Sequence, residues 1–323
     1  MPEKKRFDVT SIGSTMLRLS VSPGERLETA PHFAVHTAGT EGNTLVALSR
    51  LGFKTGWVSR LKNDVIGHRI AGDLRSFGVD TSRVVWTEED RNETFFVEYG
   101  LRPRGVQILY DRSGSAISKI RFEEVDCSYL LDTRIFHMTG ILPALSSRCL
   151  QAAEKSFVAA AEAGVTTSFD VNYRAKLWTP RQAAKTLEPL MRMCDILFMT
   201  REDAGDLFGI SGTADQMVRD AHARFHPSIC VMTLAEEGGI AYDGTRCCRS
   251  PAYEADVIDR LGAGDSFTAG FLCGWLEGSI QTGMNYAAAM AALKLGIKGD
   301  YFVSNRRELS RIMELSGSRE IGR

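Results

Sequence analysis

The residues best suited to chemistry lie in one glycine-rich segment, Gly262-Ala263-Gly264-Asp265, which is followed by a predicted helix. Glycines at a helix N-terminus let backbone N–H groups converge on an anion, and the helix dipole adds positive potential there. A carboxylate at Asp265 would compete with a phosphate that is only bound. It could instead take a proton from a hydroxyl that attacks a phosphoryl group. The segment therefore indicates phosphoryl transfer, with helix capping as the alternative role of Asp265.

Other well-known catalytic motifs are absent from the sequence. It has no GxxxxGK[ST] loop, no His-Arg-Asp catalytic loop, no GxSxG turn and no HExxH pair. No GxGxxG follows the first predicted strand, so nothing supports a dinucleotide cofactor.

Predicted strands and helices alternate through most of the chain, which is typical of a mostly parallel sheet covered by helices on both faces. A strand-like segment also leads into the glycine-rich loop from residue 256, and Asp64 is suited to cap a helix that ends before Gly78. The predicted strands are Phe7–Gly13, Lys54–Arg60, Ile135–Thr139, Thr166–Phe169, Asp195–Met199 and Ile229–Thr233, and the main helices are Gly42–Leu51, Ser147–Ala163, Pro180–Met191, Thr213–Phe225, Asp265–Leu276 and Ile280–Leu295.

Two insertions, at about residues 14–36 and 92–121, interrupt this alternation with consecutive strands. In the second, Thr94–Tyr99 and Val106–Tyr110 flank a polar, Pro-containing turn, as in a hairpin. Two such insertions could pair as a small β-sheet lid over a single domain of residues 1–323. They could also join two chains as a homodimer or a higher homo-oligomer, and ordinary surface hairpins are the alternative.

Composition restricts the possible partners and location. The 323 residues include 39 Lys and Arg and 40 Asp and Glu, for a net charge of -1. This balance gives no reason to expect nucleic-acid or polybasic membrane binding. The weakly polar run from Tyr286 to Leu293 is too short to span a bilayer, and the N-terminus lacks the apolar core of a secretory signal. Seven Cys without a CxxC pair predict free thiols in a cytoplasmic protein rather than disulfides or a zinc site.

Two separate segments resemble the signatures of one enzyme family. DRLGAGDSF (259–267) is similar to the Asp-Thr-x-Gly-Ala-Gly-Asp signature of the ribokinase-like (PfkB) carbohydrate kinases, and AGTEGNTLVALSRLG (38–52) resembles the family's other signature. The resemblance covers nearly the whole chain. It implies an α/β fold of three αβα layers with a small β lid, a sugar as substrate, and ATP and Mg²⁺ as cofactors.

Within that family the chain looks most like the 2-keto-3-deoxygluconate kinases, through LYDRSGSA (109–116), FHMTGILPALS (136–146) and SFDVNYRAKLWTP (168–180). These segments would bring Tyr110, Arg112 and Arg174 to one site. Guanidinium groups match a carboxylate in bidentate geometry, so the three side chains favour a sugar acid over a neutral sugar. Either Arg alone could equally be a surface residue or a structural ion-pair partner.

The resemblance also implies roles for other residues. Asp265 would be the base and Gly262, Ala263 and Gly264 the anion-binding backbone, while Asp203 would hold Mg²⁺ indirectly. The other implied substrate contacts are Gly39, whose backbone would approach the sugar closely, Asn43, Phe96, Ile141 and Asp300. The implied nucleotide contacts are Asn172, Thr200, Thr233, Ala235, Gly238, Gly262, Gly264 and Asn285.

The sequence departs from the family's pattern at a few positions. Ala38 replaces the first Gly of the usual pair, Ser14 replaces an acidic or amide residue after the first strand, and Arg260 replaces Thr in the second signature. The segment from Thr200 to Asp203 matches the family's Asn-x-x-Glu only loosely. Ala235 stands where a Gly is usual, so nucleotide binding would weaken if that position needs a positive φ. These changes keep two alternatives open. One is a kinase for a neutral sugar such as fructose or for another substrate of this family, and the other is a catalytically weak sugar-binding or regulatory protein.

Overall fold

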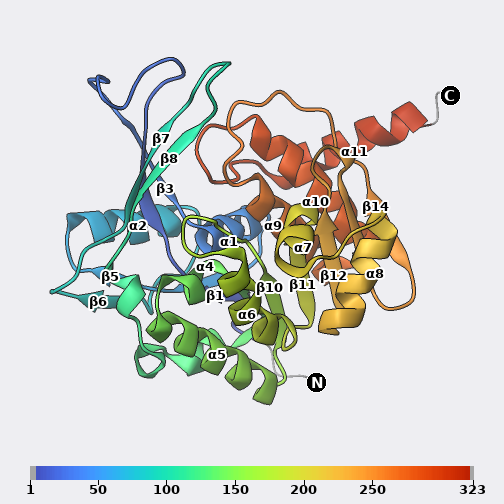
Figure 1. The fold of residues 1–323 in the computed structure, drawn as a ribbon, viewed down its shortest axis with the longest axis horizontal. Helices are drawn as coiled ribbons and strands as arrows, with labels where there is room; N and C mark the ends of the chain where they lie inside the picture. Colours follow the sequence, from blue (N-terminus) through green and yellow to red (C-terminus); the bar gives the residue numbers. More distant parts are fainter. Residues whose placement is uncertain (1–4, 321–323) are drawn as a thin grey trace.

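An eight-stranded sheet forms the centre of the computed structural model, which describes residues 5–320 (Figure 1). The strand order is β14-β13-β12-β11-β10-β9-β1-β4, and all neighbours from β12 to β4 are parallel, whereas β13 and β14 pair antiparallel. The prediction of a mostly parallel sheet is therefore confirmed. Its strands are β1 (Phe7–Ile12), β4 (Thr55–Val58), β9 (Thr133–Thr139), β10 (Thr166–Asp170), β11 (Ile196–Thr200), β12 (Ile229–Thr233), β13 (Gly239–Tyr242) and β14 (Cys247–Ser250).

Helices cover both faces of this sheet, so the chain has the expected three αβα layers. Two hydrophobic cores lie on its opposite faces, since neighbouring residues of one strand, such as Ile135 and Phe136, belong to different cores. One core is built with α1 (Thr40–Arg50), α2 (Val65–Ser76), α9 (Ala263–Glu277), α10 (Ile280–Leu295) and α11 (Arg306–Glu320). The other is built with α3 (Cys127–Leu130), α4 (Ile141–Leu145), α5 (Ser147–Glu162), α6 (Pro180–Met191), α7 (Arg201–Phe208) and α8 (Ala214–Phe225).

Small residues determine how closely α9, which carries Asp265, packs against α10. A Cβ atom on Gly270 would lie 2.7 Å from the Cα of Ala287, and one on Gly274 would lie 2.6 Å from the carbonyl oxygen of Thr282. The backbones of the two helices are therefore in contact, which holds the N-terminus of α9 in place against the sheet.

A second, four-stranded sheet projects from one end of the molecule, with the order β3-β2-β7-β8 (Figure 1). Its strands are β2 (Met16–Ser20), β3 (Ala34–Ala38), β7 (Thr94–Glu98) and β8 (Gln107–Asp111). β2 with β3 and β7 with β8 pair antiparallel, whereas β2 and β7 pair in parallel. Both insertions thus contribute to one small sheet. Two further strands, β5 (Arg60–Lys62) and β6 (Val85–Thr87), form a separate parallel pair. The single strand predicted over Lys54–Arg60 is therefore divided between β4 and β5.

Helix boundaries agree with the sequence except around the glycine-rich loop. Asp64 caps α2 by accepting hydrogen bonds from two backbone N–H groups, as predicted. The strand predicted to lead into the loop from residue 256 is wrong, since residues 256–261 form no strand. Gly262 caps α9 with a φ of 85°, so Asp265 lies inside the first turn and does not cap the helix. Among the described residues, no helix is long and apolar enough to cross a membrane.

Candidate active site

Asp265 is a buried carboxyl group at the N-terminus of α9, with 7% of its surface exposed. Its Oδ2 accepts a hydrogen bond of 2.6 Å from the side-chain amide of Asn43. Burial raises the pKa of Asp265 to about 7, although the Asn43 hydrogen bond and the charge of Arg174 act in the opposite direction. A carboxyl group with this pKa gains and loses a proton near neutral pH, as a general base requires.

The backbone around Asp265 forms a tight loop. Gly262 has a φ of +85°, and a Cβ there would lie 2.0 Å from the carbonyl oxygen of Asp300, so only glycine fits. A Cβ on Gly264 would meet nothing within 4 Å, which leaves open space in front of the helix. The N–H of Ala263 already donates to the carbonyl of Arg260, at 3.3 Å. The N–H groups of Gly264 and Asp265 belong to a first helical turn and lack intrahelical acceptors.

Asn43, on α1, connects the sugar-signature segment to Asp265. Its Oδ1 accepts a hydrogen bond from the backbone N–H of Gly39 at 3.3 Å, while its amide donates to Asp265. A Cβ on Gly39 would lie 2.1 Å from the carbonyl oxygen of Ser14. Gly39 therefore packs closely against the chain's own strand-end loop and also lines the pocket, and its approach to the sugar stays a prediction.

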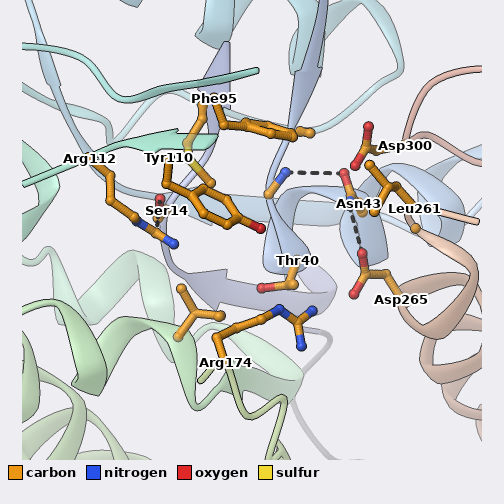
Figure 2. A pocket seen from close by; sticks show the side chains of 15 residues that line it. Ser14, Thr40, Asn43, Phe95, Tyr110, Arg112, Arg174, Leu261, Asp265 and Asp300 are labelled. Atoms are coloured by element: carbon orange, nitrogen blue, oxygen red, sulfur yellow. Dashed lines mark hydrogen bonds between the residues drawn. The ribbon is translucent and has the colours of Figure 1, made fainter. Parts of the chain in front are cut away.

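A pocket in front of Asp265 brings together every predicted substrate residue except Phe96 (Figure 2). Asp265 and Asn43 lie on one side of it, and Tyr110 and Arg112 lie on the other, on the small sheet. The residues lining it are Ser14, Met16, Ala38, Gly39, Thr40, Asn43, Phe95, Tyr110, Arg112, Ile141, Arg174, Leu261, Gly262, Asp265 and Asp300.

The aromatic wall of the pocket comes from Phe95, where the sequence prediction had Phe96. The ring of Phe95 stacks on Tyr110 with a centroid distance of 5.5 Å. Phe96 lies on the opposite face of β7, where its ring meets Phe33 edge to face at 6.1 Å. Side chains alternate across a strand, so a shift of one residue reverses which ring faces the pocket.

Arg112 is fixed in the pocket wall by an acidic neighbour. Its Nε donates to Oε1 of Glu93 at 3.1 Å, and its Nη2 donates to the hydroxyl of Ser14 at 3.3 Å. The side chains of Arg112 and Glu93 are 9% and 2% exposed, so the ion pair is almost completely buried. Glu93 was not predicted from the sequence, since no local motif marks it. It orients the guanidinium and compensates much of its charge.

Arg174 differs from Arg112 in its surroundings. It is exposed, follows β10, and extends its guanidinium toward Thr40 and Asp265 (Figure 2). Its Nη1 donates to the neighbouring carbonyl of Tyr173 at 3.0 Å, and it forms no ion pair within the part of the chain described. Arg174 is therefore not held by one carboxylate, and its charge acts on the carboxyl groups of Asp265, Asp203 and Asp170.

Known proteins resemble this chain over nearly its whole length. Residues 6–306 match the pfkB family carbohydrate kinases. The chain belongs to this family. It is 35% identical to the 2-dehydro-3-deoxygalactonokinase of Haloferax volcanii, over 95% of this chain and 96% of that protein. It is 30% identical to the 2-dehydro-3-deoxygluconokinase of Bacillus subtilis, over 91% of each. The crystal structure of the 2-dehydro-3-deoxygluconokinase of Thermotoga maritima covers 95% of this chain and 98% of its own, with a TM-score of 0.89 and 31% identity.

These findings confirm the ribokinase-like fold and the carbohydrate-kinase activity inferred from the two signatures. In this PfkB kinase, the carboxyl ends of neighbouring parallel strands carry further candidate residues. Thr200 and Thr233 are register partners at the ends of β11 and β12, and Asn172 follows β10. All three therefore reach the same sheet edge. Asn285, on α10, accepts a hydrogen bond from Gln281. A nucleotide role for these residues stays a prediction.

The departure at Ala235 has a structural consequence. Ala235 begins a 3₁₀ turn, Ala235–Glu237, and has a φ of 52°. Gly238, at the end of that turn, has a φ of +89°, and a Cβ there would lie 2.1 Å from the carbonyl oxygen of Ser250. The turn thus contains one glycine where only glycine fits, and an alanine in the left-handed region that disfavours a side chain.

Three carboxyl groups, those of Asp170, Asp203 and Asp265, lie at this edge of the sheet, and Arg174 is the cationic side chain whose charge acts on all three. Burial, then the charges of Asp265 and Asp203, raise the pKa of Asp170 to about 7. Burial raises the pKa of Asp203 to about 6, whereas Arg174 acts to lower it. Asp170 lies within SFDVNYR, but sequence reasoning did not single it out. No group of three or more potential ligands is arranged to bind a metal directly among the described residues. The excess negative charge nevertheless suits a divalent cation held through water.

Proposed function

We propose that this kinase transfers the γ-phosphate of ATP to the primary hydroxyl of 2-dehydro-3-deoxygluconate (2-keto-3-deoxygluconate), giving the 6-phosphate. The observation that carries this proposal is one pocket with a buried carboxyl, Asp265, at one side and two guanidinium groups, Arg112 and Arg174, that can meet a sugar-acid carboxylate. The names of the relatives agree, because both 2-dehydro-3-deoxygluconate and 2-dehydro-3-deoxygalactonate are sugar acids.

Asp265 would act as the general base. Its carboxylate would accept the proton of the substrate's primary hydroxyl as the oxygen attacks the γ-phosphorus and ADP leaves. The hydrogen bond from Asn43 leaves the second carboxylate oxygen available for this proton. The N–H groups at the start of α9 would stabilise charge on the transferring phosphoryl group.

The nucleotide would lie along the carboxyl edge of the central sheet, where parallel α/β sheets bind ligands. Asn172, Thr200, Thr233, Gly238 and Asn285 are the proposed contacts, together with Ala235, Gly262 and Gly264. Asp170 and Asp203 would hold a Mg²⁺ ion through its waters, and the ion would neutralise phosphate charge when bound. We place the reaction in the cytoplasm, because ATP is available there and all seven cysteines are free.

The small sheet would act as a lid on a single kinase domain that spans residues 1–323. Tyr110 and Arg112 come from its strand β8 and the residue after it, so movement of the sheet would move both side chains relative to Asp265. A closed lid would exclude water and limit hydrolysis of ATP. The segments that would form this lid are residues 14–36 and 92–121.

The outer face of the small sheet would bind a second copy of the chain. Val35, Leu19, Phe96 and Leu109 are successive register partners and form one apolar row across all four strands. Val35 and Leu109 are 41% and 56% exposed. Matching rows from two copies could cover each other across a symmetric contact. Light scattering is expected to give twice the chain mass of 35.6 kDa, and a monomer at every concentration would contradict this contact.

The ion pair between Arg112 and Glu93 favours a second candidate, a kinase for a neutral sugar such as fructose, because it removes charge that a sugar acid would use. ADP release with Mg-ATP separates the two candidates when 2-dehydro-3-deoxygluconate, 2-dehydro-3-deoxygalactonate and fructose are compared. We expect a kcat/KM for a sugar acid at least about 100-fold above that for fructose, as expected for two charge-assisted contacts. An equal or higher value for fructose would favour the second candidate. Thermal stabilisation by a sugar without ADP release would indicate a binding protein.

A further inference from the structure

A group of four charged side chains is buried beside the glycine-rich loop, and one of them, Asp300, also lines the pocket. Arg18 comes from β2 of the small sheet and Lys294 from the last turn of α10, and both are completely buried. Asp259 and Asp300 are 1% and 6% exposed. The backbone of Asp300 packs against Gly262, and Asp259 lies at the start of the loop that contains Gly262. Burying charged side chains costs free energy unless they are paired, so the partners of these four groups show what stabilises them.

The two carboxylates are tied to Arg18 and to the backbone of the loop. Arg18 donates to Oδ2 of Asp259 at 2.7 Å and also to Asp300. Asp259 in turn accepts hydrogen bonds from the N–H groups of Leu261, at 3.1 Å, and Gly299, at 3.0 Å. Asp259 therefore holds together both segments that shape the anion-binding loop.

Lys294 supplies the second positive charge of the group. Its ammonium donates to the carbonyl oxygen of Asp259, at 3.4 Å, and to that of Ile297, at 3.0 Å. The N–H groups of Ile258 and Asp259 donate to the carbonyl of Leu295 at 2.8 and 3.1 Å, so the same helix end binds the loop twice. Burial lowers the pKa of Lys294, and the charges of Asp259 and Asp300 act in the opposite direction.

The charge balance shows what Lys294 contributes. Without it, two carboxylates would face one guanidinium, and a net negative charge would lie just beneath the backbone that receives a phosphoryl group. Lys294 adds a second cationic side chain beside these two carboxyl groups; burial raises the pKa of Asp300, and the charges of Arg18 and Lys294 act to lower it. Lys294 does not line the pocket, so its hydrogen bonds act on the loop that begins at Asp259, and its charge acts on Asp300 and Asp265 from behind.

We propose that Lys294 is a positioning residue for phosphoryl transfer, an internal cation that fixes the loop from Asp259 to Gly262 and cancels the negative charge behind it. This inference rests on the proposed kinase reaction, but Lys294 is not among the residues that line the pocket. It predicts an effect on kcat, because the loop acts on the transferring group, and little effect on the KM of the sugar.

The test removes the cation and then replaces it from solution. For Lys294→Ala, kcat is expected to fall by about 10- to 100-fold, as for a misplaced catalytic group, while the KM of the sugar changes by less than about 3-fold. Ammonium ions at about 100 mM are expected to fill the vacated space and restore at least about a third of the lost kcat, whereas tetramethylammonium at equal ionic strength does not. Lys294→Met keeps the space filled and is expected to lose kcat without rescue.

Met290→Ala is the matched control, since Met290 is buried on the same helix without a polar role. It is expected to lower the unfolding temperature but to keep kcat within about 3-fold, with no response to ammonium. A normal kcat in Lys294→Met, or a loss in Lys294→Ala that ammonium does not reverse, would overturn the proposal. If Lys294→Ala does not fold, kcat of Lys294→Met decides alone.

Failure of the proposed reaction can be recognised separately. If the wild-type protein releases no ADP with any sugar, the kinase proposal fails. Selective thermal stabilisation of Lys294→Ala by ammonium still tests the internal cation, and its absence would then overturn the inference.

Discussion

The two sides of the pocket treat their charged groups in opposite ways. On the phosphoryl side, Asp265 has an amide partner, Asn43, and its pKa is raised to about 7 by burial. On the sugar side, Arg112 is paired with Glu93 before any substrate arrives. The first arrangement prepares a group for proton transfer. The second arrangement fixes the orientation of the Arg112 guanidinium, and Glu93 compensates part of its positive charge.

The same contrast separates the two arginines that line the pocket. Arg112 is nearly buried and has defined partners, whereas Arg174 is exposed and forms no ion pair among the described residues. Arg112 can therefore impose geometry on a bound carboxylate, and Arg174 can contribute charge. Glu93 therefore contributes to substrate specificity as much as either arginine does, because it orients Arg112.

The largest expected effect comes from removing the base. Asp265→Asn should lower kcat by about 10³-fold, within the usual contribution of general base catalysis, because an amide cannot accept the proton. Because folding raises the pKa of Asp265 from 3.8 to about 7, this group lowers stability progressively between those pH values, and the full cost is present above about pH 7. The variant should therefore unfold at a temperature no lower than wild type at pH 8. ADP release and thermal unfolding measure the two effects, and a kcat within tenfold of wild type would contradict the role of Asp265.

A smaller and selective effect is expected at Arg112. Arg112→Ala should lower kcat/KM for the sugar acid by about 100-fold and for fructose by less than about 5-fold, because Glu93 is left as an uncompensated buried charge near the carboxylate. Adding Glu93→Gln to Arg112→Ala should restore part of the loss, since the unpaired charge is removed. Equal losses for both sugars would show that Arg112 only supports the structure.

The smallest effect is expected in the nucleotide turn. Ala235→Gly should lower the KM for ATP by about 2- to 3-fold, because glycine adopts the observed φ of 52° without strain. The KM of the sugar should not change, which serves as the internal control. A higher KM for ATP would mean that the alanine side chain itself contributes to nucleotide binding.

Features that depend on residues close together in the sequence could be predicted from it. The glycine-rich loop, the cap of α2 by Asp64 and most strands and helices follow from local patterns, and the structure contains them. The parallel order of the central sheet also follows from the alternation of strands and helices. In these regions, short-range geometry and hydrophobic periodicity determine the structure.

The remaining features depend on contacts between distant segments. Asp300 pairs with Arg18, which lies 282 positions away in the sequence, and no sequence motif predicts such a pair. The choice of Phe95 over Phe96 depends on the register of β7 against β2 and β8, which a one-residue shift reverses. Glu93 and Lys294 were not predicted for the same reason, because their roles depend on partners that only folding brings close to them.

Calorimetric binding of 2-dehydro-3-deoxygluconate to the two variants tests the division of the pocket most directly. We expect Asp265→Asn to bind the sugar acid within about 3-fold of wild type, because that side acts on the transferring group, while Arg112→Ala binds at least about 30-fold more weakly. Equal weakening in both variants, or normal binding by Arg112→Ala, would contradict the separation of a proton-transfer side from a carboxylate-binding side.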